Sequence, residues 1–222
     1  MRRSVILISL IVFLISFIWL LTTNSAKTRR ERLPGSNFLS PEIDRLLQEL
    51  EDFNQRHAMF NVPRKDGILL RMLVEMSGAK NALEIGTSNG YSAIWIGSGL
   101  KITGGHLTTI EILPEKVKMA RENFKKAGLS KVVTVIEGNA FKVLPDLEGP
   151  FDFVFLDAGK SDYYDFFKIF YPKVKKGGII AAHNAISFAG AMRDYLDAVS
   201  NHPDLETVIV SVSYTHLTLP TN

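Results

Sequence analysis

The sequence contains no cysteine. This absence excludes disulfide bonds, thiolate metal ligands and a cysteine nucleophile, although it leaves the cellular compartment open. A strong excess of one charge is also lacking, because the formal net charge of the 222 residues is only +3 and much of it lies near the N-terminus. The rest of the chain is close to balanced, and we therefore expect no nucleic-acid partner.

The sequence has a single long apolar run, and it lies at the N-terminus. Residues 5–21 carry no charge, and Arg2 and Arg3 precede them. The run is short for a membrane-spanning helix and long for the core of a signal peptide. We interpret residues 1–26 as one uncleaved membrane anchor, because residues 24–26 make a poor cleavage site. A cleaved signal peptide, and hence an exported domain, is the alternative.

Residues 27–39 are basic, include a proline and a glycine, and are interpreted as a linker. Residues 40–212 are long enough for one domain with a buried core. This domain begins with two amphipathic helices and continues with apolar strands that alternate with helices. The strands are expected at residues 81–85, 106–110, 132–136, 151–156, 178–182 and 206–212, and the helices between them at 91–98, 114–127, 140–144, 163–170 and 190–199. The alternation predicts a doubly wound α/β fold, with a mostly parallel sheet covered on both faces.

The loop after the first expected strand has the spacing Glu84-x-Gly86-x-x-x-Gly90-Tyr91-Ser92. A dinucleotide-binding turn places its glycines closer together, so that the backbone can meet a pyrophosphate. The wider spacing suits a bulkier and uncharged contact, such as the methionine part of S-adenosylmethionine. We expect the carboxylate of Glu84 to face the ammonium group of that ligand.

Polar residues follow the next two expected strands. Glu111 stands where such folds bind ribose, because a carboxylate accepts hydrogen bonds from both hydroxyls. A solvated charge at a strand end is the alternative. The small residues of Gly138-Asn139-Ala140 leave room for a flat base beside the backbone, and an ordinary turn explains them equally well.

The fourth and fifth expected strands end in a second group of polar residues. Asp157 is followed three residues later by Lys160, and a lysine beside a bound cation can act as a general base. A salt-bridged loop lysine is the alternative. Asp157, His183 and Asn184 offer O, N and O donors to one divalent ion, unless His183 only forms a hydrogen bond to a loop.

Taken together, these residues resemble the class I S-adenosylmethionine-dependent O-methyltransferases, and above all the cation-dependent group that includes catechol and caffeoyl-coenzyme A O-methyltransferases. The resemblance extends over about residues 40–212. It implies methyl transfer from S-adenosylmethionine to a hydroxyl of a small, catechol-like acceptor. It implies that Asp157 and Asn184 bind a metal and that Lys160 takes the proton of the acceptor hydroxyl. The cofactor-binding set predicted on this basis comprises Val62, Glu84, Gly86, Thr87, Ser88, Gly90, Tyr91, Ser92, Glu111, Ile112, Asn139, Ala140 and Asp157.

Two departures from the family pattern stand out. His183 replaces an aspartate, which lowers the expected affinity for Mg²⁺ and favours Mn²⁺, Fe²⁺ or Zn²⁺, or a site that works without metal. The family also closes its sheet with a final antiparallel strand, and residues 213–222 do not resemble it because no Gly or Asn-Gly turn precedes them. We interpret residues 213–222 as foreign to the family, and the chain as truncated. The exposed sheet edge that this leaves would allow a homodimer.

Two other functions fit parts of the pattern. One is a nicotinamide-dependent oxidoreductase, which the glycine spacing disfavours. The other is a membrane-tethered protein that keeps the cofactor pocket without turnover, which the histidine at position 183 and the altered tail would suit. Since S-adenosylmethionine is made in the cytoplasm, we expect the domain to face the cytoplasm.

Overall fold

The computed structural model describes residues 39–211 and 215–220, which belong to one compact unit. Within these ranges, no helix is both long enough and apolar enough to cross a membrane. The predicted anchor and most of the predicted linker lie outside the described residues, so both stay predictions.

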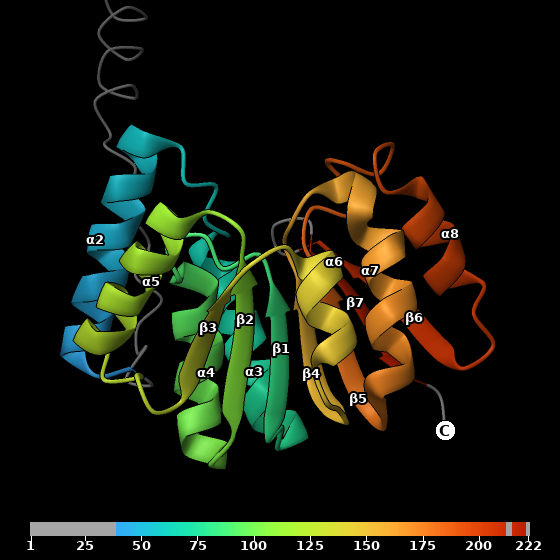
Figure 1. The fold of residues 1–222 in the computed structure, drawn as a ribbon, viewed down its shortest axis with the longest axis horizontal. Helices are drawn as coiled ribbons and strands as arrows, with labels where there is room; N and C mark the ends of the chain where they lie inside the picture. Colours follow the sequence, from blue (N-terminus) through green and yellow to red (C-terminus); the bar gives the residue numbers. More distant parts are fainter. Residues whose placement is uncertain (1–38, 212–214, 221–222) are drawn as a thin grey trace, which may run out of the picture. The chain divides into compact units, whose positions relative to one another are not determined.

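The sheet has seven strands in the order β3-β2-β1-β4-β5-β7-β6 (Figure 1). The first five of these run parallel, and β7 runs antiparallel to both of its neighbours. The strands are β1 (Asn81–Ile85), β2 (His106–Glu111), β3 (Val133–Glu137), β4 (Phe151–Leu156), β5 (Val174–Ala182), β6 (Leu205–Val210) and β7 (Thr215–Pro220). The predicted mostly parallel α/β sheet is therefore confirmed.

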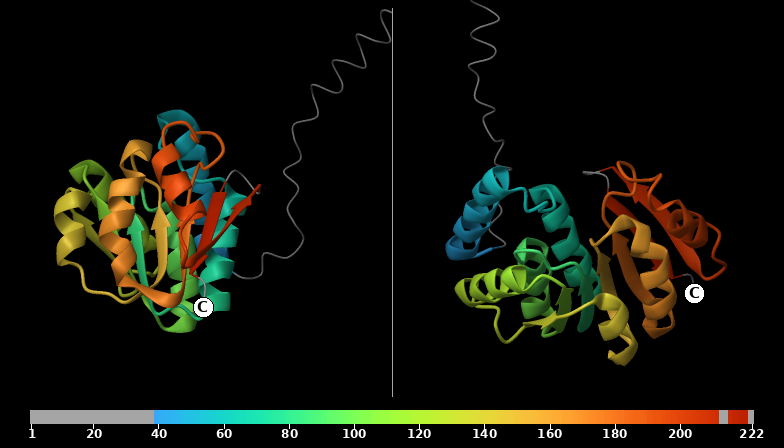
Figure 2. Two further views of the ribbon diagram at one scale, coloured as in Figure 1. Left: turned by 90° about the vertical axis from the view of Figure 1, so that its right-hand side faces the viewer. Right: turned by 45° about the horizontal axis from the view of Figure 1, so that its top comes forward.

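The last strand, β7, corrects the expectation that the tail forms no closing strand. It lies between β5 and β6, with Ala181 opposite Leu217 and Thr207 opposite Thr218 (Figure 2, left). The prediction failed because it required a tight hairpin turn. A hairpin with a longer connection needs no Asn-Gly signal. At this end of the sheet the edge strand is β6, and the foreign origin of residues 213–222 stays a prediction.

Helices cover the two faces of the sheet around two separate apolar clusters. Side chains alternate between the clusters along each strand, so that Ala82 joins one and Leu83 joins the other. The first cluster packs under α2 (Pro41–His57), α3 (Arg64–Ser77), α4 (Tyr91–Thr103) and α5 (Pro114–Lys126), and the second under α6 (Ala140–Val143), α7 (Tyr163–Phe170) and α8 (Arg193–Ser200). This arrangement covers the parallel strands on both faces and leaves their ends accessible.

Most element boundaries lie within three residues of their predicted positions, but α4 continues five residues beyond its predicted end at Ser98. Glycine has a low helix propensity, but the glycines of α4 allow the helix to pack closely against its neighbours. A Cβ on Gly97 would stand 2.8 Å from the Val133 side chain, and one on Gly99 would stand 3.0 Å from Val74. The helix therefore lies tightly between the sheet and α3, which fixes the loop that precedes it.

Candidate active site

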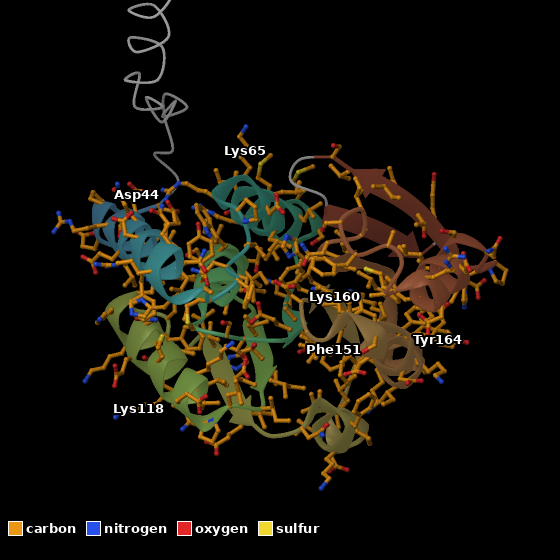
Figure 3. The ribbon with its side chains drawn as sticks, turned by 90° about the horizontal axis from the view of Figure 1, so that it is seen from above. Asp44, Lys65, Lys118, Phe151, Lys160 and Tyr164 are labelled. Carbon is orange, nitrogen blue, oxygen red and sulfur yellow. The ribbon has the colours of Figure 1, made fainter. Side chains whose placement is uncertain are left out.

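The predicted site residues gather at the carboxyl ends of the parallel strands. Ile85 of β1 lies opposite both Ile110 of β2 and Leu156 of β4, and Leu156 lies opposite Ala182 of β5. The residues that follow these positions therefore share one edge of the sheet, as such folds require of a ligand site. Figure 3 looks onto this edge from above, with Lys160 near the middle of the view.

Both glycines of the β1–α4 loop occupy positions that another residue would disturb. Gly86 has a φ of 103°, and a Cβ there would stand 2.3 Å from the backbone oxygen of Asp157. Gly90 has a φ of 86°, and a Cβ there would stand 2.7 Å from the ring of Phe124. Glycine adopts such angles at little cost. The loop can therefore pass close to the end of β4.

Glu84 is completely buried below this loop, which corrects the expectation that its carboxylate faces a ligand. The Ser92 hydroxyl donates to one carboxylate oxygen at 2.6 Å, and the Thr109 hydroxyl donates to the other at 2.5 Å. Burial raises the pKa of Glu84 to about 7, although both hydrogen bonds act to lower it. The side chain therefore ties β1 to α4 and β2 from inside the protein.

Glu111 is held by the backbone at the end of β2. One carboxylate oxygen accepts a hydrogen bond from the N–H of Ser88 at 2.8 Å, and the other accepts from Ile112 and Leu113 at 3.0 Å each. A carboxylate has about four acceptor positions, so this geometry leaves room for a ligand hydroxyl. Such a fixed carboxylate differs from the freely solvated charge that was the alternative.

Several other members of the predicted cofactor set have partners inside the protein. Tyr91 is 1% exposed, and its hydroxyl donates to Glu51 of α2 at 2.7 Å. The Thr87 hydroxyl shares a hydrogen bond of 2.6 Å with Thr109, and the Ser88 hydroxyl donates to the Met59 carbonyl at 3.0 Å. These hydroxyl groups, like that of Ser92, therefore bind other protein groups and are not directed at a ligand.

The remaining members lie around the rim or in the core. Val62 is buried in the cluster below α2 and α3, whereas Ile112 is 57% exposed. Asn139 caps α6, where its side-chain oxygen accepts from the N–H of Phe141 at 2.9 Å, and Ala140 packs against the second cluster. Asn139 thus serves the ordinary turn that was one of the two interpretations.

Asp157 and Lys160 form an ion pair just beyond β4. The Lys160 ammonium donates to Asp157 at 2.7 Å and to the Tyr163 hydroxyl at 2.7 Å, and that hydroxyl donates to the Leu156 carbonyl at 2.9 Å. Burial would raise the pKa of Asp157, but the His183 hydrogen bond and the charge of Lys160 lower it below its usual value. The lysine is thereby fixed in position, with 14% of its side chain exposed.

His183, directly after β5, lies between two carboxylates. Its Nδ1 is 3.3 Å from Asp157, and its Nε2 is 3.3 Å from Asp66 in the first turn of α3. Burial acts to lower the pKa of His183, but the contacts with Asp157 and Asp66 raise it to about 9. Asp66 is the residue that sequence reasoning missed, because an acid in the first turn of a helix is common on electrostatic grounds alone.

The predicted metal ligands have contacts with other protein groups. Asp157 lies 3.3 Å from Nδ1 of His183, and the Asn184 amide nitrogen donates to Ser187 at 3.4 Å. Among the described residues, no group of three or more His, Cys, Asp or Glu side chains is arranged to hold a metal ion. The metal set Asp157, His183 and Asn184 stays a prediction.

The structure indicates the class of enzyme, and comparison with known proteins identifies the family. The sheet order, the glycine loop after β1 and the fixed carboxylate after β2 fit an S-adenosylmethionine-dependent methyltransferase. The sequence profile of the O-methyltransferase family matches residues 38–208, and the chain belongs to that family. It is 35% identical over 156 residues to a catechol O-methyltransferase of Niastella koreensis, which covers 68% of this chain and 70% of that protein.

Solved structures agree with this assignment. An O-methyltransferase from Bacillus cereus in complex with S-adenosylhomocysteine aligns with a TM-score of 0.70 and 27% identity, over 80% of this chain and 91% of that one. A second, from tomaymycin synthesis in Streptomyces achromogenes in complex with S-adenosylmethionine, aligns with a TM-score of 0.68 and 25% identity, over 82% and 91%. The predicted enzyme class and cofactor are confirmed, and the oxidoreductase alternative is removed.

Proposed function

We propose that this protein methylates a hydroxyl of a small aromatic acceptor, of the catechol-like class, bound beside Asp157 and Lys160. The observation that carries the proposal is the fixed ammonium of Lys160, held at 2.7 Å by both Asp157 and the Tyr163 hydroxyl. It stands beside the loop where the backbone of Gly86 approaches Asp157. The relative named a catechol O-methyltransferase supports the acceptor class.

The residues at the edge fit the cofactor. Glu111 retains an acceptor position for a ribose hydroxyl, and Gly86 brings the loop against the backbone of Asp157. When bound, S-adenosylmethionine supplies a methyl group on a positively charged sulfur. Asp157, whose side chain is 15% exposed, has its backbone against Gly86, and it takes the role towards the ligand ammonium that Glu84 cannot fill.

The chain's own part in the transfer is to bind, orient and deprotonate. As the neutral amine, Lys160 takes the proton of the acceptor hydroxyl and becomes the ammonium, which Asp157 and Tyr163 keep in place. Methyl transfer from a sulfonium needs little more than correct alignment, because fixing two reactants in position removes much of the entropic barrier. Positioning by this ion pair is therefore the main contribution of the acceptor side.

The proposed location is the cytoplasmic face of a membrane, with residues 1–26 as the anchor. The uncharged run at residues 5–21 and the basic residues on either side of it support this location. Extraction of membranes at alkaline pH tests it, because an anchored protein stays in the pellet and an exported one with a cleaved leader does not. A homodimer stays a prediction, with β6 as the sheet edge.

The first experiment is calorimetric titration of S-adenosylhomocysteine into the full-length protein, followed by release of S-adenosylhomocysteine from a panel of phenols. Binding together with transfer supports the proposal. Binding without transfer to any acceptor favours a cofactor-binding protein without turnover. A folded protein that does not bind S-adenosylhomocysteine contradicts the proposal.

A further inference from the structure

A row of four ionisable side chains fills the place where the family pattern implies a divalent cation. It runs from Asp66 through His183 and Asp157 to Lys160, with separations of 3.3, 3.3 and 2.7 Å. Its members come from α3, from the loop after β5 and from the loop after β4. This row of side chains therefore spans the acceptor side of the site.

Both ring nitrogens of His183 face carboxylates, although only Nδ1 forms a hydrogen bond. A histidine ligand must direct a nitrogen lone pair at the ion. Here Nδ1 faces Asp157 and Nε2 faces Asp66, and the histidine side chain is 6% exposed. Asp66 is 1% exposed, so the ring is enclosed on that side by the protein. A metal could bind His183 only after one of these contacts was broken.

The other two implied ligands offer few oxygens to an ion. Asp157 Oδ1 already accepts from the Lys160 ammonium at 2.7 Å, and an ion bound to the same carboxylate would lie close to that positive charge. Asn184 donates its amide nitrogen to Ser187, so it offers an ion only its one amide oxygen. A hard cation such as Mg²⁺ prefers about six oxygen ligands, and these side chains supply few that are not already paired.

We propose that this enzyme transfers the methyl group without a divalent cation, and that its acceptor needs only one hydroxyl. The proposal rests on the proposed function. A vicinal pair of hydroxyls gains affinity when both oxygens chelate one metal ion, whereas the ammonium of Lys160 meets a single oxygen. His183 is then a positioning residue, which contacts the same oxygen of Asp157, Oδ1, as Lys160 does.

Manganese binding to the full-length protein tests the proposal independently of activity. We expect the electron paramagnetic resonance signal of free Mn²⁺ to be unchanged by the wild-type protein. His183→Asp supplies a third oxygen ligand, and we expect it to bind Mn²⁺ at least about tenfold more tightly than wild type. His57→Asp, which makes the same change on an exposed residue of α2, is the control for non-specific binding.

Wild-type binding of Mn²⁺ with a dissociation constant below about 100 µM, lost in Asp157→Asn, would overturn the proposal. This measurement decides the matter even if His183→Asp does not fold.

Activity gives the second test. We expect EDTA or added Mn²⁺ to change turnover by less than about twofold, and a monohydroxyl phenol to match its vicinal dihydroxyl counterpart within about fivefold in kcat/KM. A tenfold loss in EDTA that Mn²⁺ restores would overturn the proposal. Absence of all transfer and of S-adenosylhomocysteine binding would instead contradict the proposed function, while the manganese result would still decide the metal question.

Discussion

The two halves of the site are built by different means. On the cofactor side, the carboxylates of Glu84 and Glu111 accept hydrogen bonds from hydroxyls and backbone N–H groups. On the acceptor side, Asp157 is paired with the ionisable side chains of Lys160 and His183. Because backbone groups form part of the cofactor side, its geometry depends on the fold. The acceptor side is made of side chains, so one substitution can change its contacts. The departure from the family pattern accordingly lies in the acceptor half.

The largest expected effect concerns the acceptor half alone. Lys160→Ala removes the group that takes the acceptor proton, and general bases contribute about 10²- to 10⁴-fold to rate. We expect kcat to fall by about that factor, while calorimetry gives an unchanged affinity for S-adenosylhomocysteine. Lys168→Ala, which removes an exposed lysine paired with Asp165, is the matched control. Unchanged turnover in Lys160→Ala would refute the role of base.

Gly86→Ala should affect both halves, because its Cβ would meet the Asp157 backbone at 2.3 Å and the φ of 103° disfavours alanine. We expect a loss of more than about 3 kcal/mol in the free energy of unfolding, together with weaker cofactor binding. Gly128→Ala is the control, since its φ is 65° but nothing lies within 4 Å of the added Cβ. It should cost about 1 kcal/mol. Equal losses in urea unfolding of the two variants would show that the close approach is unimportant.

A pH series tests the buried carboxylate of the cofactor half. The pKa of Glu84 is raised from 4.5 to about 7 in the folded protein. As pH rises between these values, the unfolded state loses this proton before the folded state does. The free energy of unfolding therefore falls over this range. Glu84→Gln keeps the shape without the charge. We expect its stability relative to wild type to increase from pH 4.5 to pH 7, by up to about 3 kcal/mol.

Denaturant unfolding at several pH values measures this difference. Glu115→Gln, an exposed position on α5, should show no comparable change. A difference between Glu84→Gln and wild type that stays constant with pH would mean that Glu84 does not titrate in this window.

The smallest expected effect separates binding from stability in the cofactor half. Glu111→Gln replaces one acceptor oxygen with a donor NH₂ group, although three backbone N–H groups converge on this carboxylate. We expect S-adenosylhomocysteine to bind about tenfold more weakly in calorimetry, with little change in kcat at saturation. Glu122→Gln on α5 is the exposed control. Wild-type affinity in Glu111→Gln would place the ribose elsewhere.

The fold was largely predictable from the sequence because strand and helix periods alternate clearly from Asn81 onwards. The limits of β1 and β4 agree with the prediction, and α4 was underestimated because packing against Val133 overrides the low helix propensity of glycine. The strand β7 was missed because local turn chemistry was the only criterion applied, whereas its pairing is set by β5 and β6, far from it in the sequence.

The site was predictable in position but less so in contacts. Strand ends locate Glu111, Asp157 and His183, since parallel register determines which residues share an edge. The direction of a side chain depends on tertiary neighbours, so burial of Glu84 and the contact from Asp66 could not be foreseen. Contacts between residues far apart in the chain leave no local sequence signal.

The position of β7 has a consequence for the order in which the protein matures. The residues that lead into His183, Ile180 to Ala182, pair with β7, which is the last of the described strands in chain order. On the ribosome, the strands that form the cofactor half emerge well before this partner exists. During synthesis, the cofactor half can therefore assemble early, whereas the acceptor half stays incomplete until β7 has been released.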